Sequence, residues 1–144
     1  MSFSNVAENA ILALIFNATT WANYAINATA SPETNIVAAL ATADPGDTGT
    51  MSTSESAYTN YARQNIARTT SGFTAPSGGS TAFNANVDFP SSGASGTTIT
   101  HGQLGKSGGG AADVIVNGAI SPNISIPSAG VIPRLTTAST VTLD

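Results

Sequence analysis

The spacing of hydrophobic positions changes once along the chain, near residue 35. In residues 5–16 (NVAENAILALIF) apolar side chains recur at helical spacing, for example at Val6, Ala10 and Leu14. The pattern predicts a helix over about 5–16, with Asn5 as its N-cap. The apolar face is wide, so we expect it to lie against a sheet or a partner chain, with Ile11 and Leu14 buried.

Beyond residue 35 the apolar positions form short extended runs. Residues 35–42 (NIVAALAT) are almost continuously apolar, which predicts a buried strand. Residues 81–89 alternate, placing Phe83, Ala85, Val87 and Phe89 on one side of a single predicted strand. The remaining predicted strands span residues 61–68, 97–104, 113–120, 123–126 and 139–144.

Clusters of Gly, Pro and Ser separate these runs, as in PSSGASG and KSGGGAA. Short strands at this spacing are typical of antiparallel all-β folds. The chain is therefore predicted to be mainly β, an antiparallel β-sandwich or barrel with one N-terminal α-helix. The 144 residues are enough for a single domain, with the β region spanning about 35–144.

Composition adds an unusual feature to this picture. Charged residues make up 8% of the chain, against roughly 25% in an average soluble domain. Small polar residues must therefore cover much of the surface. Because charge keeps free proteins apart in solution, this surface suits a protein that is packed against neighbours, and a homo-oligomer is expected.

The charges that are present exclude two classes of partner. The four basic residues form no run along the sequence, and the net charge is −4. Neither a phosphate-binding patch nor a polybasic membrane patch can be built from them. We therefore expect no nucleic-acid and no membrane partner. The basic residues are Arg63, Arg68, Lys106 and Arg134.

One stretch, TADPGDTGTMSTSE, has the spacing of a calcium-binding loop. Asp44, Gly49 and Glu55 occupy positions 1, 6 and 12 of such a loop, but positions 3 and 5 are Gly46 and Thr48. Pro45-Gly46 is a strong turn dipeptide. The stretch is therefore predicted to be a turn supported by the Asp44 side chain, with no metal and no cofactor.

The chain also offers little for catalysis. Its one histidine, His101, lies in a predicted strand without a nucleophile motif, so a packed or interface role is favoured. Carboxylates cluster only around residues 44–55, which is a weak signal for paired acid–base chemistry. We expect no catalytic residues and no enzymatic activity.

Four segments in order carry a resemblance to a known family: TADPGDTGT, SESAYTNYARQNIART, NVDFPSSGASGTTITHGQLG and GAISPNISIPSAGVIPRLTTASTVTLD. They resemble small virion structural proteins of tailed bacteriophages, which are often labelled tail-fibre proteins. The resemblance covers about residues 5–144. The family implies no catalytic residue and no cofactor, and it implies a place in the virion after assembly in the bacterial host cytoplasm.

Two functions follow as hypotheses. We expect a capsid decoration protein that stabilises the particle through symmetric contacts with itself and the major capsid protein. The alternative is a tail-fibre or tail-associated module that binds host surface glycan. Two roles stay open for Arg63 and Arg68: pairing with carboxylates such as Asp88 or Glu55, or a solvated position on the surface, since exposed pairs contribute little. The predicted interface residues are Ile11, Leu14, Trp21, Arg63, Arg68 and His101.

Overall fold

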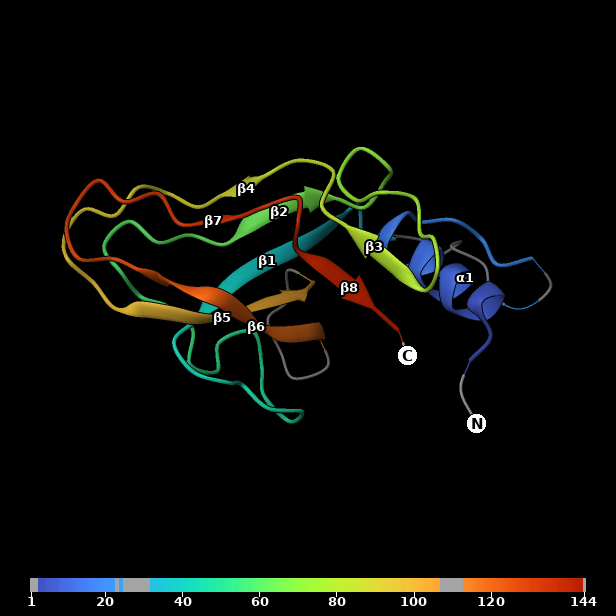
Figure 1. Ribbon diagram of the computed structural model, residues 1–144, viewed down its shortest axis with the longest axis horizontal. Helices are drawn as coiled ribbons and strands as arrows, with labels where there is room; N and C mark the ends of the chain where they lie inside the picture. Colours follow the sequence, from blue (N-terminus) through green and yellow to red (C-terminus); the bar gives the residue numbers. More distant parts are fainter. Residues whose placement is uncertain (1–2, 23, 25–31, 107–112, 144) are drawn as a thin grey trace. The chain divides into compact units, whose positions relative to one another are not determined.

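The computed structural model describes residues 3–22, 24, 32–106 and 113–143 (Figure 1). Contacts divide the chain into two compact units that are interleaved in sequence. Unit 1 comprises residues 1–35, 67–87 and 135–144, and unit 2 comprises residues 36–66 and 88–134. The expectation of a single domain over residues 1–144 stays a prediction.

Unit 2 is built on a four-stranded sheet with the order β2-β1-β5-β6. Strand β1 pairs antiparallel with β5, from Val37 opposite Gly105 to Ala41 opposite His101. Strand β5 pairs antiparallel with β6. The bounds are β1 Asn35–Ala41, β2 Gln64–Ala67, β5 Thr98–Gly105 and β6 Val114–Ser125.

The predicted buried strand is the centre of this sheet. Every residue of β1 after Asn35 is buried, as its continuous apolar run indicated. Met51 packs in a cluster with Val37 and Ala39, and the ring of Phe89 is also buried. Strand β6 joins two segments, 113–120 and 123–126, that the sequence pattern had predicted as separate strands.

Unit 1 contains the helix α1 (Asn5–Phe16), which contacts β3 (Ser80–Ala82). Strand β3 pairs antiparallel with β8 (Thr140–Thr142). The core of this unit is aromatic: the ring of Phe73 lies 4.9 Å from that of Phe16 and 5.6 Å from that of Phe83, centroid to centroid.

The helix has the predicted bounds, but its N-cap residue and its buried face differ from the prediction. Its N-cap is Ser4, whose Oγ accepts a hydrogen bond from the N–H of Ala7, so the prediction of Asn5 was wrong by one residue. The buried residues are Glu8, Leu12 and Phe16, which follow each other at four-residue spacing. Ile11 and Leu14 are partly exposed, so their expected burial within the domain was wrong, and their burial against a neighbouring chain stays a prediction.

The predicted strand over 81–89 is two short strands. Strand β3 ends at Ala82, and β4 (Val87–Asp88) pairs with a different partner, β7 (Arg134–Leu135). Residues 84–86 between them are exposed. Phe83, Val87 and Phe89 are buried, as the alternation predicted, whereas Ala85, which was expected on the same side, is exposed.

The fold class is therefore confirmed: mainly β, with antiparallel sheets and a single N-terminal helix. Within the described residues no sheet closes into a barrel, which leaves the sandwich of the two predicted architectures. Across the described part of the chain, no helix is long and apolar enough to span a membrane.

Candidate functional site

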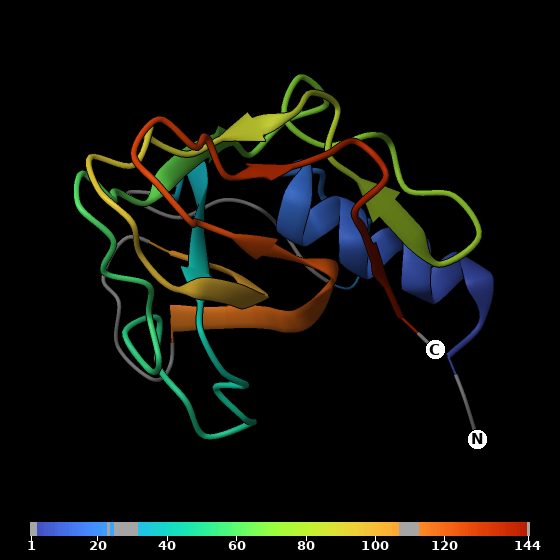
Figure 2. The ribbon, with the colours of Figure 1, turned by 60° about the vertical axis from the view of Figure 1, so that its left-hand side comes forward.

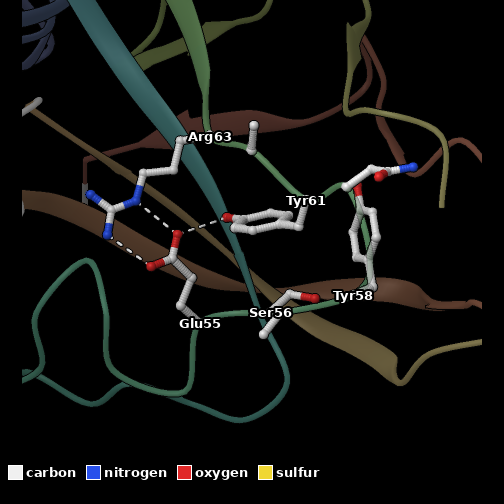
Figure 3. Close-up of a pocket in the computed structure, with 8 residues that line it drawn as sticks. Glu55, Ser56, Tyr58, Tyr61 and Arg63 are labelled. Carbon is white, nitrogen blue, oxygen red and sulfur yellow. Dashed lines mark hydrogen bonds and ion pairs between the residues drawn. The ribbon is translucent and has the colours of Figure 1, made fainter. Parts of the chain in front are cut away.

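An open pocket of about 590 Å³ lies within unit 2, beside the segment that leads from the turn after β1 into β2 (Figure 3). Its lining is local in sequence and comes from both sides of a tight loop. Most of its side chains are polar. The lining residues are Glu55, Ser56, Ala57, Tyr58, Asn60, Tyr61, Ala62 and Arg63.

A bidentate ion pair between Arg63 and Glu55 forms one side of this pocket. Arg63 donates from Nε to Oε1 of Glu55 at 2.7 Å and from Nη2 to Oε2 at 2.8 Å. The same Nη2 donates to Oγ of Ser52 at 3.0 Å. This hydrogen bonding to Glu55 raises the pKa of Arg63. The predicted pairing of Arg63 with Glu55 is therefore confirmed.

The hydroxyl of Tyr61 connects the ion pair to the sheet. It donates to Oε1 of Glu55 at 3.0 Å and accepts from the backbone N–H of Leu40 in β1, also at 3.0 Å. The ring is stacked on that of Phe89, with centroids 6.2 Å apart. Burial raises the pKa of Tyr61 far above its ordinary value, so the phenol stays protonated at neutral pH.

The other side of the pocket is held by a second tyrosine. The hydroxyl of Tyr58 donates to the carbonyl of Pro90 at 2.8 Å, and its ring meets the edge of Tyr61 at 5.3 Å. Asn60 donates to the carbonyl of Ser91 at 3.3 Å. The loop is thus fixed to residues 90–91 by side chains, which makes it part of the scaffold.

The chemistry available in this pocket is limited. Its lining contains one carboxylate, that of Glu55, whereas paired acid–base catalysis needs two. That carboxylate already accepts from Arg63 and Tyr61. The Oγ of Ser56 is buried and makes no hydrogen bond, and no histidine lines the pocket to activate it. The arrangement suits a structural clamp on β1.

The turn that resembles a calcium loop is held by its own residues. Oδ1 of Asp44 accepts from the N–H of Gly46 at 2.9 Å, as predicted, and Gly46 has a φ of +67°. Glu55, at position 12 of the loop spacing, is engaged by Arg63. No group of three or more potential metal ligands occurs among the residues that the structure describes. The absence of a bound metal remains a prediction.

Arg68 was expected to pair with a carboxylate, and the structure gives it different partners. Its guanidinium donates to the carbonyls of Leu14 and Ile15 in the last turn of α1 and to the carbonyl of Glu33. These helix carbonyls have no intrahelical partner, and a cation is favoured there. Arg68 therefore caps the helix. Asp88, the other expected partner, pairs with Arg134.

The remaining predicted interface residues are not brought together in one site. Ile11, Leu14 and Trp21 belong to unit 1, where all three are partly exposed. The ring of Trp21 lies 4.8 Å from that of Tyr24, which is largely exposed. His101 belongs to unit 2 and is partly buried in β5, where Nδ1 lies 2.9 Å from Oγ1 of Thr100. An interface role for any of them stays a prediction.

Sequence reasoning missed Tyr61 as the centre of the pocket. Its main partner is a backbone amide 21 positions earlier in the chain, and residue types alone do not reveal such a contact. The available signal was the close sequence spacing of Glu55, Tyr61 and Arg63 just before a strand.

No curated protein matches the chain. The family described as Podophage GP4 fiber I protein gp80 matches residues 2–141, nearly the whole sequence. This confirms the resemblance to virion structural proteins of phages and implies a location in the virion. The chain belongs to the Podophage GP4 fiber I protein gp80 family.

Proposed function

We propose that this chain is a non-enzymatic structural subunit of a phage fibre, assembled into the particle in the host cytoplasm. The observation that carries this proposal is the match of residues 2–141 to a family described as a fibre protein. The proposal replaces capsid decoration as the preferred function and keeps its structural character.

The pocket supports a structural role. The Glu55 carboxylate is saturated by Arg63 and Tyr61, and the Tyr61 hydroxyl also binds the amide of Leu40. These contacts join the loop to β1. Contacts of this kind stabilise the backbone of the protein itself, which supports a structural role.

The low charge of the surface supports close packing against other virion proteins, which we propose as the partners. With charged residues at 8%, few charges must be desolvated when subunits dock. Tail proteins are the expected partners in a fibre, and the major capsid protein is the expected partner in a decoration protein.

Capsid decoration remains the second candidate, favoured by one property of the sequence. The chain has neither heptads nor a repeat from which a fibre stalk could be built. In that case the protein would cover capsid surfaces, and its loss would make particles burst at lower temperature.

Copy number and position in the particle separate these candidates. The experiment is a cryo-electron microscopy reconstruction of virions, combined with immunogold labelling of this chain. A handful of copies at the tail supports the fibre proposal, and hundreds of copies on the head would replace it with decoration. Absence from purified virions would overturn both.

A further inference from the structure

The four-stranded sheet of unit 2 ends in a long strand with a free edge. Strand β6 (Val114–Ser125) has 12 residues and pairs with β5 on one side (Figure 2). No strand among the described residues pairs with its other side. The opposite edge strand, β2, has only four residues. The backbone groups along an open edge can pair with another chain.

Most proteins protect such an edge, by short length, charged side chains, proline or bulges. In the first part of β6 the protection is limited to a register irregularity at Ile115. Residues 114–125 (VIVNGAISPNIS) contain no charged residue, and their one proline is Pro122. Ahead of this proline lies the segment Val114–Ile120, which we call the β6 edge. Within it, Val116–Ala119 pair with β5 in unbroken register.

The side chains of the β6 edge are also accessible. Ile115 is 41% exposed, and Gly118 and Ala119 are exposed. A Cβ added at Gly118 would meet no atom within 4 Å. A side chain can therefore be introduced at Gly118 without displacing another described part of the chain.

We propose that the β6 edge pairs antiparallel with the β6 edge of a second copy of this chain, so that two sheets become one. Antiparallel pairing about a two-fold axis is self-complementary, because each copy presents the same backbone donors and acceptors. The segment carries no charge, so two copies meet without repulsion. Its Val and Ile residues favour extended pairing.

This inference goes beyond the proposed function, because it concerns the purified chain and does not depend on the location of the chain in the virion. Strand β5 is paired on both sides, by β1 and β6, and has no free edge to offer.

The test uses opposite charges at Gly118, where a side chain fits in the isolated copy. Gly118→Lys and Gly118→Glu each place like charges near the two-fold axis, which destabilises strand pairs. We expect each variant alone to associate more weakly by a factor on the order of ten or more, and an equimolar mixture to recover the pair. Wild type should sediment at about twice 14.3 kDa.

Two matched controls accompany the charge variants. Gly118→Ala adds a side chain without charge, and Ser95→Lys adds the same charge at an exposed loop position of unit 2. Both should associate like wild type. Circular dichroism melts of every variant verify folding, and Ala119→Lys with Ala119→Glu repeat the test if the Gly118 variants melt early.

Three outcomes would overturn the proposal. The first is a monomeric wild type at protein concentrations of about 100 µM, where even weak specific pairs are populated. The second is unchanged association of folded Gly118→Lys, which would assign the contact to another surface. The third is the failure of the Lys and Glu variants to associate when mixed.

Discussion

Strands β1 and β6 belong to one sheet and look alike in sequence, but their surroundings differ. Both contain several Val, Ile and Ala residues, and neither contains a charged residue. Strand β1 has a neighbouring strand on each side and is buried from Ile36 to Ala41. Strand β6 has one neighbour, and most of its residues are partly or fully exposed.

The comparison shows that the absence of charge has a different physical consequence in each strand. In the centre of a sheet, a charge would be desolvated without compensation, so an apolar strand is required for folding. At an edge, a charge would be solvated and would also block pairing with other chains. Folding therefore does not require an edge strand to be uncharged, whereas pairing with another chain is favoured by the absence of charge.

The largest expected effect is a loss of unfolding free energy when a buried residue of β1 is truncated, compared with an exposed residue of β6. Leu40 in β1 is fully buried, whereas Ile115 in β6 is 41% exposed. Leu40→Ala should lower the free energy of unfolding by about 2–5 kcal/mol because it leaves a cavity. Ile115→Ala should cost less than about 1 kcal/mol. Urea titrations followed by circular dichroism, in the Gly118→Lys background, measure both without a contribution from pairing.

Equal losses for these two variants would contradict the assigned positions of the strands in the sheet.

The next effect concerns the side chain that binds β1 from outside the sheet. Tyr61→Phe removes the acceptor of the Leu40 N–H and one donor to Glu55. The loss should be about 1–3 kcal/mol, because a buried N–H is left unpaired. Tyr58→Phe is the matched control, since it frees only a carbonyl, that of Pro90. Urea titrations measure the two losses.

Amide exchange measured by NMR then localises the effect. The N–H of Leu40 should exchange faster in Tyr61→Phe and at the wild-type rate in Tyr58→Phe. Unchanged exchange at Leu40 in both variants would show that the hydroxyl does not hold β1.

A smaller effect appears at alkaline pH. Burial raises the pKa of Tyr61 above its ordinary value of 10.0, so the folded protein keeps a proton that the unfolded chain loses. This contribution to stability is complete below pH 10 and declines as the pH rises above it. Urea midpoints between pH 8 and 11 should fall more steeply for wild type than for Tyr61→Phe. Parallel curves would contradict the raised pKa.

The smallest effect is expected for the ion pair between Asp88 and Arg134, both of which are 48% exposed. The hydrogen bond from Arg134 lowers the pKa of Asp88 from 3.8. Its contribution is therefore present above that pH and is lost as the pH falls through the lower folded value. Asp88→Asn should match wild type in thermal melts at pH 7, because solvent screens the pair. A clear loss at pH 7 would show that the pair does more than this exposure allows.

Local patterns in the sequence predicted the parts of the fold that depend on neighbours along the chain. The continuous apolar run of β1 predicted its burial, and the helical spacing predicted the bounds of α1. The buried face of α1 was predicted wrongly, because several rows of apolar residues along a wide apolar face could each be the buried one. The burial of Phe16 involves its contact with Phe73, which is far away in sequence.

The same limit applies to strand partners and to the candidate site. The break between β3 and β4 follows from their pairing with β8 and β7, which come more than 45 residues later. Pairing of Arg63 with a carboxylate such as Glu55 was one of two roles predicted for it, because the sequence has only four basic residues. The contact of Tyr61 with the Leu40 amide was not predicted. Nearly every residue has a backbone N–H, so the sequence does not indicate which of them a side chain binds.

In this account, β1 pairs with a neighbouring strand on both edges within one copy. The second edge of β6 is paired only when two copies associate. Hydrogen–deuterium exchange of peptides covering 36–41 and 114–120, measured across protein concentrations, tests it most directly. We predict that residues 36–41 are protected at every concentration. Residues 114–120 should gain protection as the concentration rises, and should not gain it in Gly118→Lys. Protection of residues 114–120 that is independent of concentration and identical in Gly118→Lys would contradict the account.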